Sequence, residues 1–86
     1  MLNFPNPSRI FDPTRRAVRF WGHDSAMEWS FFVTEEALNR LQPKAQHDAA
    51  SLLLAFDANL TVIYAAAIKA YNQGRKGSDE LGATDF

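Results

Sequence analysis

One stretch of helical pattern limits what this chain can fold into. From Asp48, a good helix N-cap residue, apolar residues recur at alternating spacings of three and four as far as Gly74, a typical residue just past a helix end. At about 1.5 Å per residue, a helix over residues 48–73 would span about 39 Å. A domain of 86 residues is only roughly 30 Å across, so we expect the helix either to overhang the domain or to bend, at residues 57–59.

The second half of this helix is apolar on nearly all sides. Between residues 60 and 70 only Thr61 and Lys69 are clearly polar, which predicts burial on more than one side. The side chains that a small sheet and one short helix would leave uncovered form a candidate interface: Val62, Tyr64, Ile68 and Tyr71. We favour self-association as a homodimer, because small domains often complete a core with a partner. The alternative is that the short helix and the C-terminal tail cover this side.

The first third of the chain, residues 1–33, has the pattern of a sheet. Two runs that alternate apolar and polar residues, 16–21 and 26–33, flank a polar turn and predict an antiparallel hairpin. Folding the hairpin about His23 and Asp24 places Arg19 opposite Glu28 as an opposite-charge cross-strand pair. The same register pairs apolar side chains on the inner face, where Phe31 joins them: Val18 with Trp29, and Phe20 with Met27.

A short helix is predicted over residues 34–41. Thr34 is a good N-cap, and Glu35 and Glu36 occupy the first turn, where the helix dipole favours negative charge. The tail, residues 78–86, is either disordered or adds an edge strand.

These elements predict one α+β domain over residues 1–86. Its small antiparallel meander sheet has three strands, or four if the tail contributes one, and is packed by one short and one long helix. The expected core is Phe4, Val18, Phe20, Met27, Trp29, Phe31, Leu38, Leu53, Phe56, Leu60 and Ile63.

No catalytic, cofactor-binding or metal site is predicted. The chain has no cysteine, which removes thiolate nucleophiles and cysteine-based metal sites. The tripeptide His23-Asp24-Ser25 holds the residue types of a hydrolase triad, but consecutive residues in a turn cannot converge on one line of proton transfer. His47 lies in a different loop from His23, and a metal site needs three or four converging ligands. We therefore expect a protein that is not an enzyme.

Two arginines and two aromatic residues are expected to share the outer face of the hairpin: Arg15, Arg19, Trp21 and Phe32. Such a set can pair phosphates and stack bases, but Trp, Phe and Arg are also enriched in protein interfaces. Nine Lys and Arg against ten Asp and Glu give a formal net charge of −1, so a basic field over the whole chain is absent. We favour contact with protein, either another copy or a different protein, and keep a nucleic-acid-binding module as the alternative.

Arg75 and Lys76 stand between two glycines, as in the GxxG loop with which KH domains clamp a nucleic-acid backbone. Residues 72–73 are polar where that motif is apolar, and residues 79–80 add carboxylates beside the loop. A glycine helix end followed by a basic turn is the simpler interpretation. Under the nucleic-acid alternative, Arg75 and Lys76 extend the patch of Arg15 and Arg19.

The chain carries no pattern that predicts export or a membrane partner. Its first residues lack the features of a signal peptide, and no apolar run approaches about 20 residues. A cytoplasmic location is the expectation.

With these residues in place, the chain resembles a family of short, uncharacterised bacterial proteins catalogued as domain of unknown function 1488. The resemblance rests on Phe4-Pro5, Asp12, Val18-x-Phe20, Met27 to Val33, Glu36-Ala37-Leu38 and the long helix from Asp48. It implies a meander sheet with two helices and a bacterial cytosolic origin, and it carries over no catalytic or ligand-binding residue.

Overall fold

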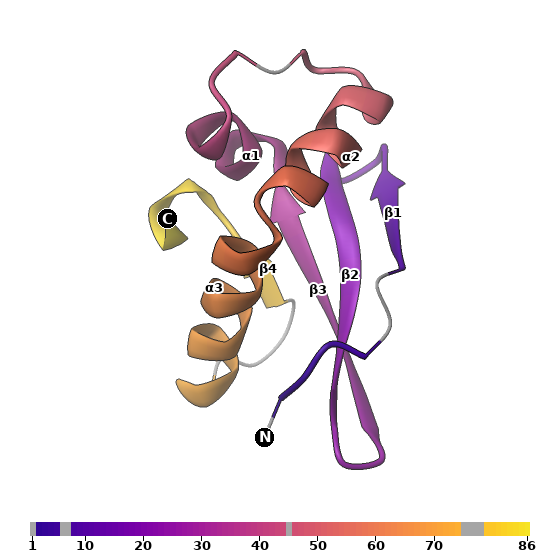
Figure 1. Cartoon of the computed structure of the whole chain (residues 1–86), viewed down its shortest axis with the longest axis vertical. Coiled ribbons are helices and arrows are strands. Elements are labelled where there is room, and N and C mark those ends of the chain that lie inside the picture. Colours follow the sequence, from indigo (N-terminus) through magenta and orange to yellow (C-terminus); the bar gives the residue numbers. More distant parts are fainter. Residues whose placement is uncertain (1, 6–7, 45, 75–78) are drawn as a thin grey trace.

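The computed structural model describes residues 2–5, 8–44, 46–74 and 79–86, and over these it confirms the predicted α+β fold (Figure 1). The elements are β1 (Arg9–Asp12), β2 (Ala17–Asp24), β3 (Met27–Thr34), α1 (Glu35–Leu41), α2 (Ala49–Ala58), α3 (Leu60–Asn72), β4 (Asp79–Leu81) and a 3-10 turn, η1 (Ala83–Asp85).

The strands form one sheet in the order β1-β2-β3-β4. The first three make the predicted antiparallel meander, and β4 joins parallel to β3. The tail therefore supplies the fourth strand, β4, which is only three residues long. The residues after β4 form the 3-10 turn η1. In Figure 1, α2 and α3 lie on the same side of the sheet, and α1 continues from the end of β3.

The predicted register of the β2–β3 hairpin is wrong. Asp24 pairs with Met27, so the loop consists of Ser25 and Ala26, and Arg19 lies opposite Phe32. The faces were nevertheless assigned correctly, because the shift along β3 is by an even number of residues and alternation has a period of two. A two-residue hairpin loop needs a positive φ, which Ser25 adopts at 56°.

The predicted helix over residues 48–73 is two helices. α2 and α3 meet at 81°, and the break falls at Asn59, within the segment where a bend was expected. The Asn59 side chain donates a hydrogen bond of 2.8 Å to the Ala55 carbonyl, which lies in the last turn of α2, and so caps the end of that helix. Among the described residues, no single helix is long and apolar enough to span a membrane. α2 and α3 reach the necessary length and apolar composition only when taken together, as a bent pair.

Most of the expected core is buried between the sheet and the helices. Phe20, Phe31 and Phe56 form its centre, with ring centroids 5.2 to 5.5 Å apart between Phe20 and the other two. Met27 was expected there but is 59% exposed, because it lies at the tip of the hairpin beside the loop. Small helical residues that the prediction passed over are fully or almost fully buried and let the helices approach the sheet: Ala37, Ala55, Ala67 and Ala70.

The N-terminal segment pairs with the end of β2 at the edge of the sheet, on the side of β2 that faces away from β3. Asn3 and His23 exchange two backbone hydrogen bonds of 2.7 and 2.8 Å, and Leu2 is buried. Gly22 leaves room for the side chains of Leu2 and Phe4 on the inner face, since a Cβ there would lie 2.9 Å from both Leu2 Cδ1 and Phe4 Cε1. The N-terminal segment therefore adds a single bridge to the sheet, and Leu2 and Phe4 on either side of it complete the core.

Candidate functional site

The sheet has one face covered by helices and one face that no described helix crosses. Inner-face residues of β2 and β3, such as Phe20 and Phe31, belong to the same core as residues from all three helices. The alternate residues point the other way. We call this second surface the open face and define it by Ile10, Arg15, Arg19, Trp21, His23, Glu28, Ser30 and Phe32, with Glu80 at its β4 edge.

Arginine side chains stack on aromatic rings across the open face. The Arg15 guanidinium lies 4.3 Å from the centroid of the Phe32 ring. Arg19 lies 5.6 Å from the same ring and 5.1 Å from the Trp21 ring. Phe32 is only 9% exposed, because its two arginine neighbours cover it. The four residues expected to share this face thus meet in one layer, and each cation–π contact contributes on the order of 0.5–1 kcal/mol at such a surface.

The loop between β1 and β2 places Arg15 over Phe32. Asp12 Oδ1 accepts hydrogen bonds from the backbone N–H of Thr14 at 3.0 Å and of Arg15 at 3.2 Å. An Asp side chain that bonds the backbone two residues on is a common way to start a turn. Arg16 then takes a positive φ of 50° to return the chain to β2. The turn that starts at Asp12 therefore fixes the position of the first stacked arginine.

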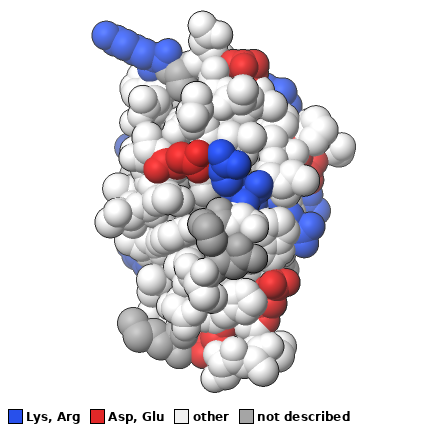
Figure 2. Space-filling view, turned by 45° about the vertical axis from the view of Figure 1, so that its right-hand side comes forward, with Lys and Arg blue, Asp and Glu red and all other residues white. Residues whose placement is uncertain are grey.

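Both signs of charge occur along the open face. Arg15 and Arg19 lie toward the end nearest α1, together with Asp12 and Glu80. Glu28, with a 58% exposed side chain, lies near the hairpin loop and contacts His23 Nε2 at 3.4 Å. In the space-filling view of Figure 2, several basic side chains lie between the centre and the right-hand edge of the face drawn, with acidic side chains beside and below them. Arg75 and Lys76 lie outside the described residues, so nothing places them with Arg15 and Arg19.

The helix residues predicted as an interface are mostly engaged within the fold. Tyr64 stacks on Phe4 with ring centroids 4.0 Å apart and rings 3° from parallel, and burial raises the pKa of its hydroxyl. Tyr71 meets Trp29 edge-on at 5.4 Å, and Ile68 packs against the core half-buried. Only Val62 of this set, at 47%, is among the exposed large apolar side chains. The predicted α3 interface therefore leaves little large apolar surface exposed apart from Val62.

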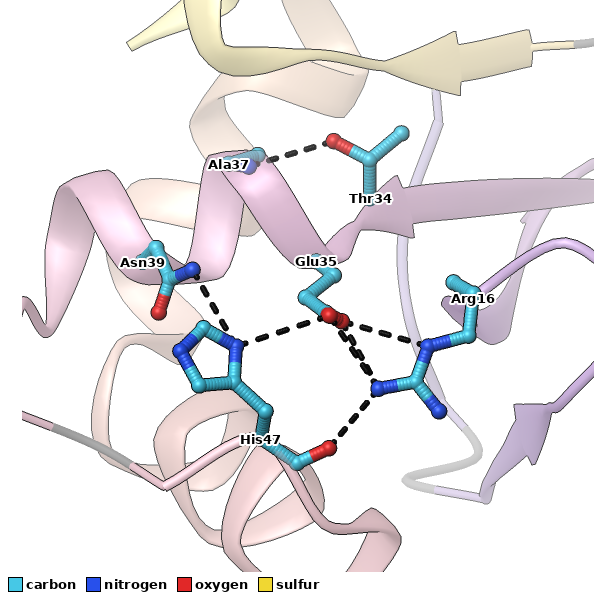
Figure 3. A network of polar contacts seen from close by, with 6 residues as sticks. All are labelled: Arg16, Thr34, Glu35, Ala37, Asn39 and His47. Carbon is cyan, nitrogen blue, oxygen red and sulfur yellow. Dashed lines mark hydrogen bonds and ion pairs between the residues drawn. The ribbon is translucent and has the colours of Figure 1, made fainter.

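A polar network that the sequence did not indicate joins three segments (Figure 3). Arg16 Nη2 lies 2.8 Å from Glu35 Oε2 and donates a second 2.8 Å bond to the His47 carbonyl. His47 Nδ1 lies 3.5 Å from Glu35 Oε1 and 3.4 Å from Asn39 Nδ2. The Arg16 guanidinium holds the pKa of Glu35 below its usual range. A paired, ionised Glu35 is suited to joining the β1–β2 loop to α1 and the start of α2, and not to proton transfer.

The surface hollows offer little for catalysis. One of about 130 Å³ lies between α3 and η1 and contains Lys69 and Asp85. Two others, of about 330 and 300 Å³, lie beside the α1–α2 connection, and Lys44 is the one charged side chain among their linings. No group of three or more His, Asp or Glu residues within the described part of the chain could hold a metal ion. None of these hollows joins a base to a nucleophile or to a metal site.

Comparison with known proteins gives one family. The model of the family described as "Protein of unknown function (DUF1488)" matches residues 2–82, a range that includes β1 to β4 and all three helices. Neither the curated proteins nor the solved structures contain a significant match. The match covers nearly the whole chain and confirms the resemblance carried by the strand and helix residues, so the protein is a member of the DUF1488 family.

Proposed function

We propose that this chain is a non-enzymatic protein-interaction module that self-associates through the open face. The observation that carries the proposal is a sheet packed by helices on one face only, whose other face presents Arg15, Arg19 and Trp21 in a stacked layer. Exposed sheet faces are usually polar, whereas Arg and Trp are enriched where proteins meet. Ile10, which is 56% exposed beside Arg19, adds apolar surface to the same face.

The charge of the open face supports protein over nucleic acid as its partner. Asp12, Glu28 and Glu80 share this side of the sheet with the two arginines, and the chain carries a net charge of −1. A backbone of phosphates would meet carboxylates as often as guanidinium groups. A second protein surface with both signs of charge is the better complement.

The hollows support a role without chemistry of its own. The hollow beside α3 is small, and the two beside α1 and α2 are lined mostly by amide and aliphatic groups, with Lys44 as their one charged side chain. In the polar cluster around Glu35, the carboxylate is already paired with Arg16. A bacterial cytoplasmic setting, implied by the family resemblance, belongs to the same proposal.

Sedimentation velocity over about 1 to 500 μM protein tests the proposal, because a small interface is expected to be weak and concentration-dependent. We expect a monomer–dimer equilibrium that Trp21→Ser weakens at least about tenfold, since a central aromatic residue dominates such interfaces. Val62→Ser, on α3, is the matched control and should change the dissociation constant less than about twofold. A monomer at every concentration contradicts the proposal.

Fluorescence anisotropy with a labelled single-stranded oligonucleotide at low salt tests the alternative. Contacts with phosphates weaken steeply as salt rises, so binding that Arg15→Gln and Arg19→Gln remove would assign the open face to nucleic acid instead. We expect no salt-sensitive binding.

A further inference from the structure

We infer that residues 2–5 are a removable strap over a docking site at the edge of β2. The site takes an extended peptide that carries an apolar residue and, two positions later, an aromatic residue. The chain's own Leu2 and Phe4 have this spacing and fill the site in the structure. Because the site lies at the edge and on the inner face of the sheet, the inference does not depend on self-association through the open face.

β2 is longer than the strand beside it, and part of its edge is not paired with β1. β1 pairs with residues 17–20 of β2, whereas β2 continues to Asp24. Along this second half, Asn3 and His23 form an isolated bridge and exchange backbone hydrogen bonds of 2.7 and 2.8 Å. The N–H and C=O groups of a strand edge are a template for pairing with another chain. The backbone of the strap therefore holds the position that an added strand takes.

On the inner side of this edge, two side chains of the strap fill a space that a glycine leaves open. A Cβ on Gly22 would lie 2.9 Å from atoms of both Leu2 and Phe4. Leu2 is only 3% exposed. The Phe4 ring stacks on Tyr64, with centroids 4.0 Å apart and rings 3° from parallel, and its centroid lies 6.1 Å from that of Phe20. A strand edge with sites for alternate side chains is how proteins bind peptides by strand addition.

The strap can leave without undoing the rest of the fold. The pairing of β1 to β4 does not involve residues 2–5. The rings of Phe20 and Phe56, 5.2 Å apart, join β2 to α2 directly. Pro5 has no N–H, so it cannot donate a hydrogen bond that would extend the bridge. Segments near a chain end with few backbone hydrogen bonds to the fold open locally at the lowest free energy.

Opening exposes the edge of β2 and the space beside Gly22 together. Backbone hydrogen bonds at the edge supply affinity, and the space beside Gly22 selects apolar and aromatic side chains at alternate positions. A tethered segment reaches an effective concentration on the order of millimolar. The strap is therefore an intramolecular competitor, and a peptide binds only in proportion to the open fraction.

Fluorescence anisotropy with a labelled synthetic peptide of residues 1–8 tests the site. We expect wild type to bind this peptide weakly and Phe4→Ala to bind it at least about tenfold more tightly, because the shortened side chain weakens the competitor. A peptide that carries Leu2→Ser and Phe4→Ser should bind neither protein. Val62→Ala, which is exposed on α3, is the matched control and should bind the peptide as wild type does.

A disulfide between the strap and β2 supplies the complementary variant. Residues that exchange both backbone hydrogen bonds, as Asn3 and His23 do, have Cα atoms about 5.5 Å apart, which is within disulfide range. The chain has no cysteine, so Asn3→Cys with His23→Cys creates one defined crosslink. We expect its oxidised form to lose peptide binding, in the wild-type and in the Phe4→Ala background, and reduction to restore it.

Hydrogen exchange of the wild-type chain tests the strap without any substitution. The backbone N–H groups of Asn3 and His23 are bonded across the bridge. If the strap opens by itself, they should exchange at least about tenfold faster than the slowest N–H groups of the β2–β3 pairing. Equal rates would mean that the strap opens only when the whole domain unfolds, and would overturn the inference.

The binding results can also overturn the inference. If Phe4→Ala binds the peptide no better than wild type, or if the oxidised crosslink leaves binding unchanged, the peptide does not bind under the strap. A disulfide that joins two chains instead of one overturns the peptide partner and assigns the site to the N-terminal segment of a second copy. If Phe4→Ala fails to fold by circular dichroism, Leu2→Ala takes its place, and the exchange rates of wild type decide independently.

Discussion

The Tyr71 hydroxyl donates a hydrogen bond of 2.5 Å to Asp24 Oδ2 and so joins the last turn of α3 to the end of β2. The two residues are 47 positions apart in the sequence. The bond lowers the pKa of Asp24 and raises that of Tyr71, because it favours the ionised carboxylate and the protonated hydroxyl. It fixes the C-terminal end of α3 against the hairpin that carries the open face.

Removing either partner of this bond should destabilise the fold, and removing both should cost less than the sum. We expect Tyr71→Phe and Asp24→Ala each to lower the midpoint of urea unfolding, because each removes this hydrogen bond. The double variant measures the coupling between them. Additive effects would contradict a direct energetic link. Tyr64→Phe is the control, since the Tyr64 ring stacks on Phe4.

Gly22→Ala should destabilise the protein by about 1–3 kcal/mol, the usual cost of forcing an extra methyl into a packed site. The added Cβ would lie 2.9 Å from Leu2 Cδ1 and from Phe4 Cε1. Gly82→Ala is the control, because no atom lies within 4 Å of a Cβ at that position. Chemical denaturation measures both variants. A shortened Leu2→Ala side chain should relieve part of the Gly22→Ala penalty, and equal costs with and without it would refute the close packing of Leu2 against Gly22.

The elements of this fold were predictable where local chemistry decides them. Thr34 caps α1 through a 3.1 Å bond from the Ala37 N–H, and Gly74 follows α3 with a φ of 67°, as their residue types indicate. The bend near Asn59 followed from comparing helix length with domain size. In each case the cause lies within a few neighbouring residues or in the length of the chain.

The register and the polar network were not predictable for the same physical reason. Sliding β3 by an even number of residues keeps Val18, Phe20 and Phe31 on the inner face, so alternation alone cannot choose among such registers. The choice depends on the Ser25-Ala26 loop and on long-range packing. The network around Glu35 depends on Arg16 and His47, which come together only once the sheet and α2 are in place.

The depressed pKa of Glu35 makes one part of the stability dependent on pH. A carboxyl whose pKa is lower in the folded state contributes stability above its unfolded pKa, and that contribution is lost as pH falls through the folded pKa. We therefore expect Glu35→Gln to destabilise the protein at pH 7 and to differ less from wild type at acid pH. Glu36→Gln, its exposed neighbour, is the control. Urea unfolding at both pH values measures the difference, and an equal effect of Glu35→Gln at both would contradict it.

Ser25 holds an unfavourable backbone conformation that glycine would relieve. Its φ of 56° lies in the left-handed region, which costs an L residue about 1–2 kcal/mol. Glycine adopts this conformation freely but loses roughly 0.5–1 kcal/mol more in conformational entropy on folding. Ser25→Gly should therefore raise the free energy of unfolding by about 0.5 kcal/mol.

Ala26, the second loop residue, has a negative φ and provides the control. Ala26→Gly relieves no strain and adds only the entropic cost, so it should lower the free energy of unfolding. The opposite signs of the two substitutions, measured by thermal or urea unfolding, identify Ser25 as the residue that closes the hairpin. If both glycines destabilise equally, the loop does not lie at Ser25-Ala26. The register that aligns Arg19, Trp21 and Glu28 on the open face would then have to be revised.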